Sequence, residues 1–313
     1  MTSQVPITYI NKYSSNMRMA LNAQSSKFRG KTMEETGSGE SYQLQNIIGN
    51  GTVKSRKTRN ADVNYDDPTF DKVWVAAPDQ KYDADLVDTL DKVRTGIELQ
   101  GAYVMKHSGV IRRAWDGIFL GGSDGTGGFY GNLRTGKMGA TVSAFPGGNL
   151  VPAATGAAAA TGMNVAKVLA VRELFAAGFA EMDEEWFLGL TAHEITGLFN
   201  QVQVTSADFK ETYKPRLSAD GKSILGLAGF TFVEIELSNP LMPNYDLTLD
   251  GSGYRRNPAW TKNGMAFVPW GDQELVSSID PIPNKFRANQ VLTTTMMEAT
   301  RTDNARVAIV LNA

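Results

Sequence analysis

The 313-residue sequence contains no cysteine, so it forms no disulfide and offers no thiolate as a metal ligand or nucleophile. That absence fits a reducing compartment or a protein without redox chemistry. No run approaches the roughly 18 apolar residues of a membrane-spanning helix, and the first residues, MTSQVPITYINKYSS, lack the apolar core of a secretory signal peptide. We therefore expect a soluble protein that is made in the cytoplasm and has no membrane partner.

The sequence is also poor in groups that carry catalysis. Its only histidines are His107 and His193, and each is expected to be structural. HEITG has Gly197 where the zinc-protease motif H-E-x-x-H needs a histidine, and GGSDGTGG (121–128) follows a helix and lacks the P-loop lysine. Two acidic clusters could bind a cation but are more typical of helix starts and surfaces: Asp83/Asp85 and Asp183/Glu184/Glu185. The residues alone thus predict no catalytic site, cofactor or metal, and favour a structural or binding protein over an enzyme.

What is present is a globular composition, 42% hydrophobic and 20% charged, with enough length for one large domain or two ordinary ones. The net charge is −2, whereas a dedicated nucleic-acid binder is usually basic. Residues 1–31 nevertheless carry five basic residues and no acid: Lys12, Arg18, Lys27, Arg29 and Lys31. Such a segment faces nucleic acid or an acidic neighbour, or is an ordinary solvated arm, and the residues leave these alternatives open.

A second charged segment separates two strand-like runs, SYQLQNIIG (41–49) and DKVWVAAP (71–78). Four basic residues come first and three acids follow: Lys54, Arg56, Lys57 and Arg59, then Asp62, Asp66 and Asp67. A two-stranded hairpin is marginally stable in water, and a loop of about twenty residues without its own core is unusual inside a compact domain. We therefore expect nucleic acid or another subunit to hold the hairpin.

Hydrophobic periodicity places the other elements. The longest helix is expected from near Leu99 to residue 121, with shorter helices at 10–23, 164–178 and 191–200. Thr191 and Glu194 match a capping box at the start of the last helix. Strands are expected at 184–190, 229–237, 265–270, 274–280, 289–301 and 305–311, and RTDN (301–304) is expected to join the last two as a hairpin. These elements predict an α+β protein with a β-rich C-terminal part.

Several individually weak motifs, taken in order, resemble the major capsid proteins of tailed bacteriophages with the Hong Kong-97 fold. ITYINKYSSNMRMALNAQSSKFRG is similar to the family's N-terminal arm, and residues about 38–80 resemble its extended E-loop. GVIRRAWDGIFLGG, which contains Arg112, Arg113 and Asp116, resembles the end of its spine helix. VTSADF, where Phe209 replaces a tyrosine, LAGFTFVEIELSNP and the stretch from IDPIPNKF onward resemble its later segments. The similarity runs through nearly the entire chain.

The resemblance implies four parts: an N-terminal arm (1–37), an E-loop (38–80), a P domain (81–163 and 263–313) with a spine helix at about 99–121, and an A domain (164–262). It implies self-assembly into pentamers and hexamers of an icosahedral shell that encloses phage dsDNA, in virions assembled in the host cytoplasm. A separate scaffolding protein, a portal and a decoration protein are the implied partners. The charged residues of the loop then become candidates for inter-subunit contact. The basic residues of the arm become candidates for facing the lumen or a neighbour.

Three other interpretations stay open at this point. An encapsulin would share the fold but enclose a cargo enzyme, so co-purified cargo would favour it. An enzyme with an α/β site in 164–262 would need catalytic groups in which the sequence is poor. A secreted β-rich adhesin would need a signal peptide.

Overall fold

The computed structural model describes residues 25–48, 53–56, 58–59, 62–63, 65, 67, 70–87, 100–178, 184–201, 216–217, 224–235 and 252–313. The predicted helix at 10–23 and the predicted turn at 205–208 lie outside these residues. Three α-helices are described: α2 (Gln100–Gly121), α3 (Val165–Ala177) and α4 (Ala192–Phe199). The first strands are β1 (Met33–Glu34), β2 (Ser41–Ile48), β3 (Phe70–Ala76), β4 (Lys81–Val87), β5 (Leu133–Thr135), β6 (Thr141–Ser143), β7 (Leu150–Val151) and β8 (Trp186–Leu190). The later strands are β9 (Arg216–Leu217), β10 (Ile224–Leu227), β11 (Phe230–Glu234), β12 (Arg255–Thr261), β13 (Met265–Pro269), β14 (Val276–Ile282), β15 (Ala288–Thr295), β16 (Met297–Arg301) and β17 (Val307–Asn312). This mixture confirms the predicted α+β class.

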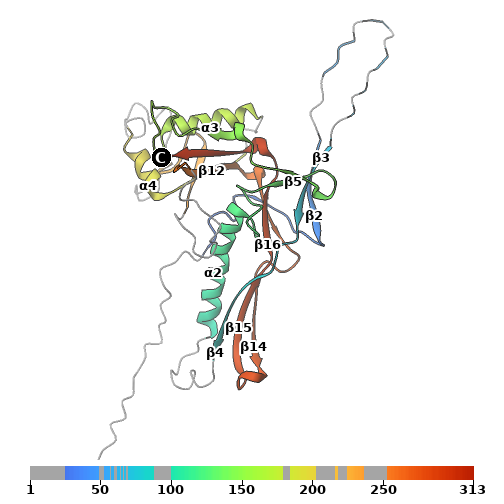
Figure 1. The fold of residues 1–313 in the computed structure, drawn as a ribbon, viewed down its shortest axis with the longest axis vertical. Helices are drawn as coiled ribbons and strands as arrows, with labels where there is room; N and C mark the ends of the chain where they lie inside the picture. The colour runs from blue at the N-terminus through green and yellow to red at the C-terminus, as the bar shows by residue number, and fades with distance from the viewer. Residues whose placement is uncertain are drawn as a thin grey trace, which may run out of the picture.

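A seven-stranded sheet, in the order β7-β17-β12-β8-β11-β10-β9, forms the upper part of the molecule in Figure 1. Strand β8 is buried along its whole length because both faces of the sheet are covered. On one face its Leu188 packs with α3 and α4 in a core that includes Phe175 and Leu198. On the other face Phe187 stacks on Trp260, with ring centroids 5.6 Å apart, in a second core that includes α2. Burial on both faces explains the unbroken apolar sequence WFLGL.

The long helix α2 runs beside a narrow three-stranded sheet, β14-β15-β4, and extends below the upper part of the molecule (Figure 1). Tyr103 and Val104 pack against a small core of Val87 and Val291. Within the described ranges, no helix, α2 included, is both long and apolar enough to cross a membrane. The predicted helix from near Leu99 to residue 121 is confirmed to within a residue at each end.

The sequence also located the other two helices and the hairpin. Helices α3 and α4 fall inside the predicted ranges 164–178 and 191–200. At the start of α4, the Glu194 carboxylate accepts a hydrogen bond from the backbone N–H of Thr191 over 2.7 Å, as the capping box predicted. Strands β2 and β3 pair antiparallel, so the predicted hairpin is confirmed.

The predicted C-terminal hairpin at RTDN (301–304) is wrong. Strand β16 pairs with β13, whereas β17 pairs with β12 and β7 in the seven-stranded sheet. The predicted strand at 289–301 is likewise two strands in two sheets, β15 beside β4 and β14, and β16 beside β13. The turn sends the chain from one sheet to another, which local turn residues do not reveal.

Candidate inter-subunit surface

Within the described residues, the β2–β3 hairpin packs against the body at its base. There, Val73 and Val75 pack with Leu44, Val268 and other buried residues in a small core. The Trp74 indole N–H also donates to the Gly136 carbonyl over 2.8 Å. Beyond this base, Figure 1 shows the hairpin extending away from the rest of the molecule. Because a hairpin without a core needs outside packing, the projecting part is a candidate contact surface.

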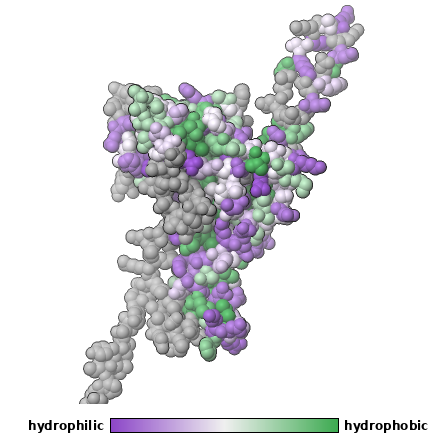
Figure 2. Space-filling view, in the orientation of Figure 1, coloured by the Kyte–Doolittle hydropathy of each residue, from purple (hydrophilic) through white to green (hydrophobic). Residues whose placement is uncertain are grey.

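The projecting part exposes large apolar side chains. Val53 is fully exposed, Tyr65 is 87% exposed, and Ile48, Val63 and Phe70 are exposed by more than half. Figure 2 shows hydrophobic and hydrophilic residues interspersed along this projection. Apolar residues gathered on one projecting element are typical of a surface that a partner covers. The charge pattern of the loop does not reveal these side chains, although the aromatic residues at 65 and 70 are a signal for them in the sequence.

The predicted charged contact residues lie between these apolar residues along the sequence. Lys54, Arg56, Arg59, Asp62 and Asp67 are all exposed, while the candidates Lys57 and Asp66 lie outside the described residues. The Arg56 Nε–H donates to the Thr58 carbonyl over 3.0 Å, a contact within the loop itself. The described charges therefore face solvent in the single subunit, and their assignment to a neighbour stays a prediction.

Three of the basic candidates of the N-terminal segment, Lys27, Arg29 and Lys31, lie on the body of the subunit. Lys27 donates its backbone N–H to Asp116 of α2 over 2.9 Å. Arg29 pairs with Glu34 at 2.7 Å and with Glu274 at 3.0 Å. Burial lowers the pKa of the Lys31 amine, partly opposed by Asp116. Residues 25–31 are thus bound to their own subunit, and the candidates Lys12 and Arg18 lie outside the described residues.

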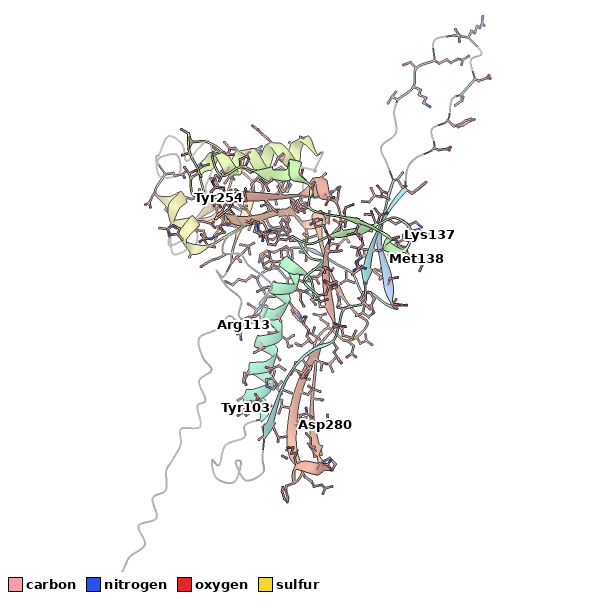
Figure 3. The ribbon with its side chains drawn as sticks, in the orientation of Figure 1. Tyr103, Arg113, Lys137, Met138, Tyr254 and Asp280 are labelled. Carbon is pink, nitrogen blue, oxygen red and sulfur yellow. The ribbon has the colours of Figure 1, made fainter. Side chains whose placement is uncertain are left out.

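A second exposed apolar surface went unrecognised in the sequence. In the β4-β15-β14 sheet, the face turned away from α2 carries Tyr82 and Leu86, which are 71% and 47% exposed. At the tip of the β14–β15 hairpin, Phe286 is 95% exposed and has a φ of 50°. Figure 3 marks the position of this hairpin with Asp280. The turn sequence PIPNKF signalled a hairpin tip but not an exposed ring.

Within the described residues, the histidines and acidic residues form no catalytic arrangement, while Asp183 of the predicted Asp183/Glu184/Glu185 cluster lies outside those residues. His107 is fully buried, and its Nε2 lies 2.9 Å from an Asp85 carboxylate oxygen, while His193 is exposed on α4. Among the described residues, no group of three or more histidine, aspartate or glutamate side chains could hold a metal ion. Asp85 also pairs with Lys106 at 2.6 Å, so the Asp83/Asp85 cluster serves an intramolecular contact.

Comparisons with known proteins agree with this architecture. A family model described as "Phage capsid protein" matches residues 5–313. The capsid structure of cyanophage P-SCSP1u has a TM-score of 0.70 at 13% identity and covers 98% of this chain and 93% of that one. The capsid of cyanophage Pam1 has a TM-score of 0.68 at 12% identity, covering 99% and 98%. The capsid of an empty GTA particle has a TM-score of 0.64 at 15% identity, covering 96% and 94%. No curated protein matches the chain.

Proposed function

Because the chain belongs to the phage capsid protein family, we propose that its subunits join into pentamers and hexamers through the projecting β2–β3 hairpin. The chain is a major capsid protein, a structural subunit of an icosahedral virion shell that assembles with copies of itself, and not an enzyme. The family match is to phage capsid proteins, and no comparison favours the encapsulin alternative.

The exposed apolar residues of the hairpin are the observation that carries the proposal. Burying a side chain such as Tyr65 or Phe70 against a neighbour contributes about 1.5–3 kcal/mol. An exposed ion pair contributes only about 0–1 kcal/mol. The apolar groups therefore supply most of the affinity. The charges from Lys54 to Asp67 set register and partner choice, since charge complementarity acts more on specificity than on affinity.

The family suggests further partners and a division of the subunit. A separate scaffolding protein and a portal would direct closure of the shell in the host cytoplasm, a decoration protein would bind outside, and dsDNA would lie within. The N-terminal arm (1–37), E-loop (38–80), P domain (81–163 and 263–313) and A domain (164–262) are the parts we propose. The sheet of the A domain would then include two strands from the P-domain ranges. Strand β7 comes from 81–163 and β17 from 263–313, and both pair within this sheet.

Charge reversal in the loop tests the proposal. We would replace Lys54, Arg56, Lys57 and Arg59 by glutamate, co-express the chain with scaffold candidates, and follow assembly by electron microscopy and light scattering. The expected result is a soluble, folded subunit with reduced shell yield. A matched control exchanges lysine and arginine at the same four positions, keeps the charge, and is expected to assemble normally. Wild-type yield from the reversed variant would contradict the role of the four basic residues while leaving the family assignment intact.

A further inference from the structure

A lysine, an asparagine and a glutamate meet inside the core beneath α3, away from the projecting hairpin. The Nζ of Lys167, on α3, donates a hydrogen bond to Oδ1 of Asn312, on β17, over 3.0 Å. Glu194, on α4, accepts a hydrogen bond at Oε1 from Nδ2 of the same asparagine over 3.1 Å. The three residues are 0%, 1% and 3% exposed, which is rare for charged groups. The asparagine amide is thus held between an amine and a carboxyl group in a dry core.

Asn257, on β12, fixes the orientation of that amide. Its Oδ1 accepts from Nδ2 of Asn312 over 2.7 Å, and its own Nδ2 donates to Oε2 of Glu194 over 2.6 Å. With Nδ2 of Asn312 held by two acceptors, its carbonyl must face the Lys167 amine. The amide oxygen therefore faces the amine, with Cγ one bond beyond it, and the nitrogen that would leave faces the carboxyl group.

The amine is also suited to act as a nucleophile. Burial lowers the pKa of Lys167 to about 8, although the nearby Glu194 charge acts in the opposite direction. At pH 7, the Lys167 amine is then neutral in roughly a tenth of the molecules. Nζ is oriented by the carbonyls of Thr161, Gly162 and Leu311 at 2.6, 3.1 and 2.9 Å. The three side chains are almost unexposed, and Val168 of α3 and Val310 of β17 belong to the buried core beside them, so little water is present to compete.

From this juxtaposition, we propose that Lys167 and Asn312 form an isopeptide bond within the subunit, with Glu194 carrying protons. The neutral amine attacks Cγ of Asn312, and the new C–N bond forms as the C–Nδ2 bond breaks. The neutral Nζ sheds one proton, which the Glu194 carboxylate takes up, in becoming an amide N–H, and Nδ2 gains one proton in leaving as ammonia, so charge and atoms balance. The Glu194 carboxyl passes a proton to the departing nitrogen that it already contacts.

Such a bond would join α3 covalently to the last strand of the seven-stranded sheet. It would close a loop of chain that contains α4 and the strands from β8 to β17, and so restrict the unfolded chain. A shell subunit would gain resistance to unfolding without any contact to a neighbour. The proposal is independent of which surfaces join subunits.

Intact-mass spectrometry of the purified full-length chain, denatured after assembly, tests the bond directly. The expected mass is lower than that of the sequence by one ammonia. Trypsin does not cleave after an acylated lysine, so digestion should give residues 138–172 joined to the peptide that begins at Val307. An unmodified mass, or conversion of Asn312 to aspartate without a link, would overturn the proposal.

Substitutions then separate the chemistry from the packing. Glu194→Gln keeps the size of the side chain and one acceptor oxygen but removes the acid, so we expect a folded chain of unmodified mass. Lys167→Met should also lack the link. Lys262→Met, which removes an exposed lysine paired with Glu185, is the matched control and should retain the link. A linked product from Glu194→Gln would contradict the assigned proton carrier.

Discussion

At the scale of single residues, Asp85 shows how a charged side chain ties the narrow sheet to the long helix. Its carboxylate accepts hydrogen bonds from Lys106 at 2.6 Å, and it lies 2.9 Å from Nε2 of the buried His107. The hydrogen bond from Lys106 is the main cause of the lowered pKa of Asp85, followed by the one from His107. The same contact raises the pKa of the Lys106 amine. The acid therefore stabilises the fold only while it is ionised.

This coupling predicts an acid-dependent loss of stability. A carboxyl group with a lowered folded-state pKa contributes fully above its unfolded value, here the ordinary 3.8, and loses that contribution as the pH falls through the lower folded value. Asp85→Asn should therefore unfold at a lower temperature than wild type at neutral pH. The difference between the two unfolding temperatures should become smaller below pH 3.8. Asp280→Asn, in the exposed part of β14 (Figure 3), is the matched control. A difference that is unchanged down to the most acidic pH would contradict the role of ionisation.

At the scale of elements, the glycines of GGSDGTGG have a structural explanation. Gly128 has a φ of 69°, and a Cβ there would lie 2.4 Å from the backbone nitrogen of Gly122. Its own N–H donates to the Ala299 carbonyl over 2.9 Å, which joins the segment to β16. The segment therefore lets the chain turn back tightly under the end of α2, and its glycines serve close backbone packing.

The close approach predicts a large effect from a small substitution. Gly128→Ala should destabilise the subunit by roughly 2–4 kcal/mol, because a left-handed conformation and a backbone clash add together. Denaturant unfolding of the free subunit measures the change. Gly197→Ala, on α4 with open space around it, is the control and should be neutral or stabilising. Similar losses in the two variants would show that backbone approach is not the cause.

Elements set by local patterns were predictable, and those set by distant pairing were not. The apolar spacing along α2 and the Thr191–Glu194 cap depend on residues a few positions apart. The positions of β16 and β17 depend on pairing with distant strands. Strand β16 pairs with β13 and β17 pairs with β12, and both partners lie tens of residues earlier. Arg301, at the end of β16, is fully buried and donates to the Phe129 and Gly131 carbonyls over 2.6 and 2.8 Å. Its position in RTDN suggested an exposed turn instead.

At the scale of the whole molecule, the sequence predicted the charged part of the candidate surface but not its apolar part. Charge clustering identified the loop between β2 and β3, because charged residues without apolar neighbours rarely form a core. It did not identify the exposed side chains of Tyr65 and Phe70, since exposure depends on how far the hairpin projects from the body. The surface combines two forces that respond differently to salt.

That difference separates the apolar contribution to assembly from the charged one. Raising the salt from about 0.1 M to about 1 M shortens the screening length from roughly 10 Å to 3 Å, which weakens exposed ion pairs and leaves apolar burial intact. If Tyr65 and Phe70 supply most of the affinity, preformed wild-type shells should persist at high salt by light scattering. The Tyr65→Ser/Phe70→Ser variant should assemble poorly at either salt concentration, although it folds normally. The matched control exchanges the two rings, as Tyr65→Phe/Phe70→Tyr. It keeps the apolar area and should assemble like the wild type. Shells that dissociate at high salt, together with normal assembly of the serine variant, would instead assign the affinity to the charged residues from Lys54 to Asp67.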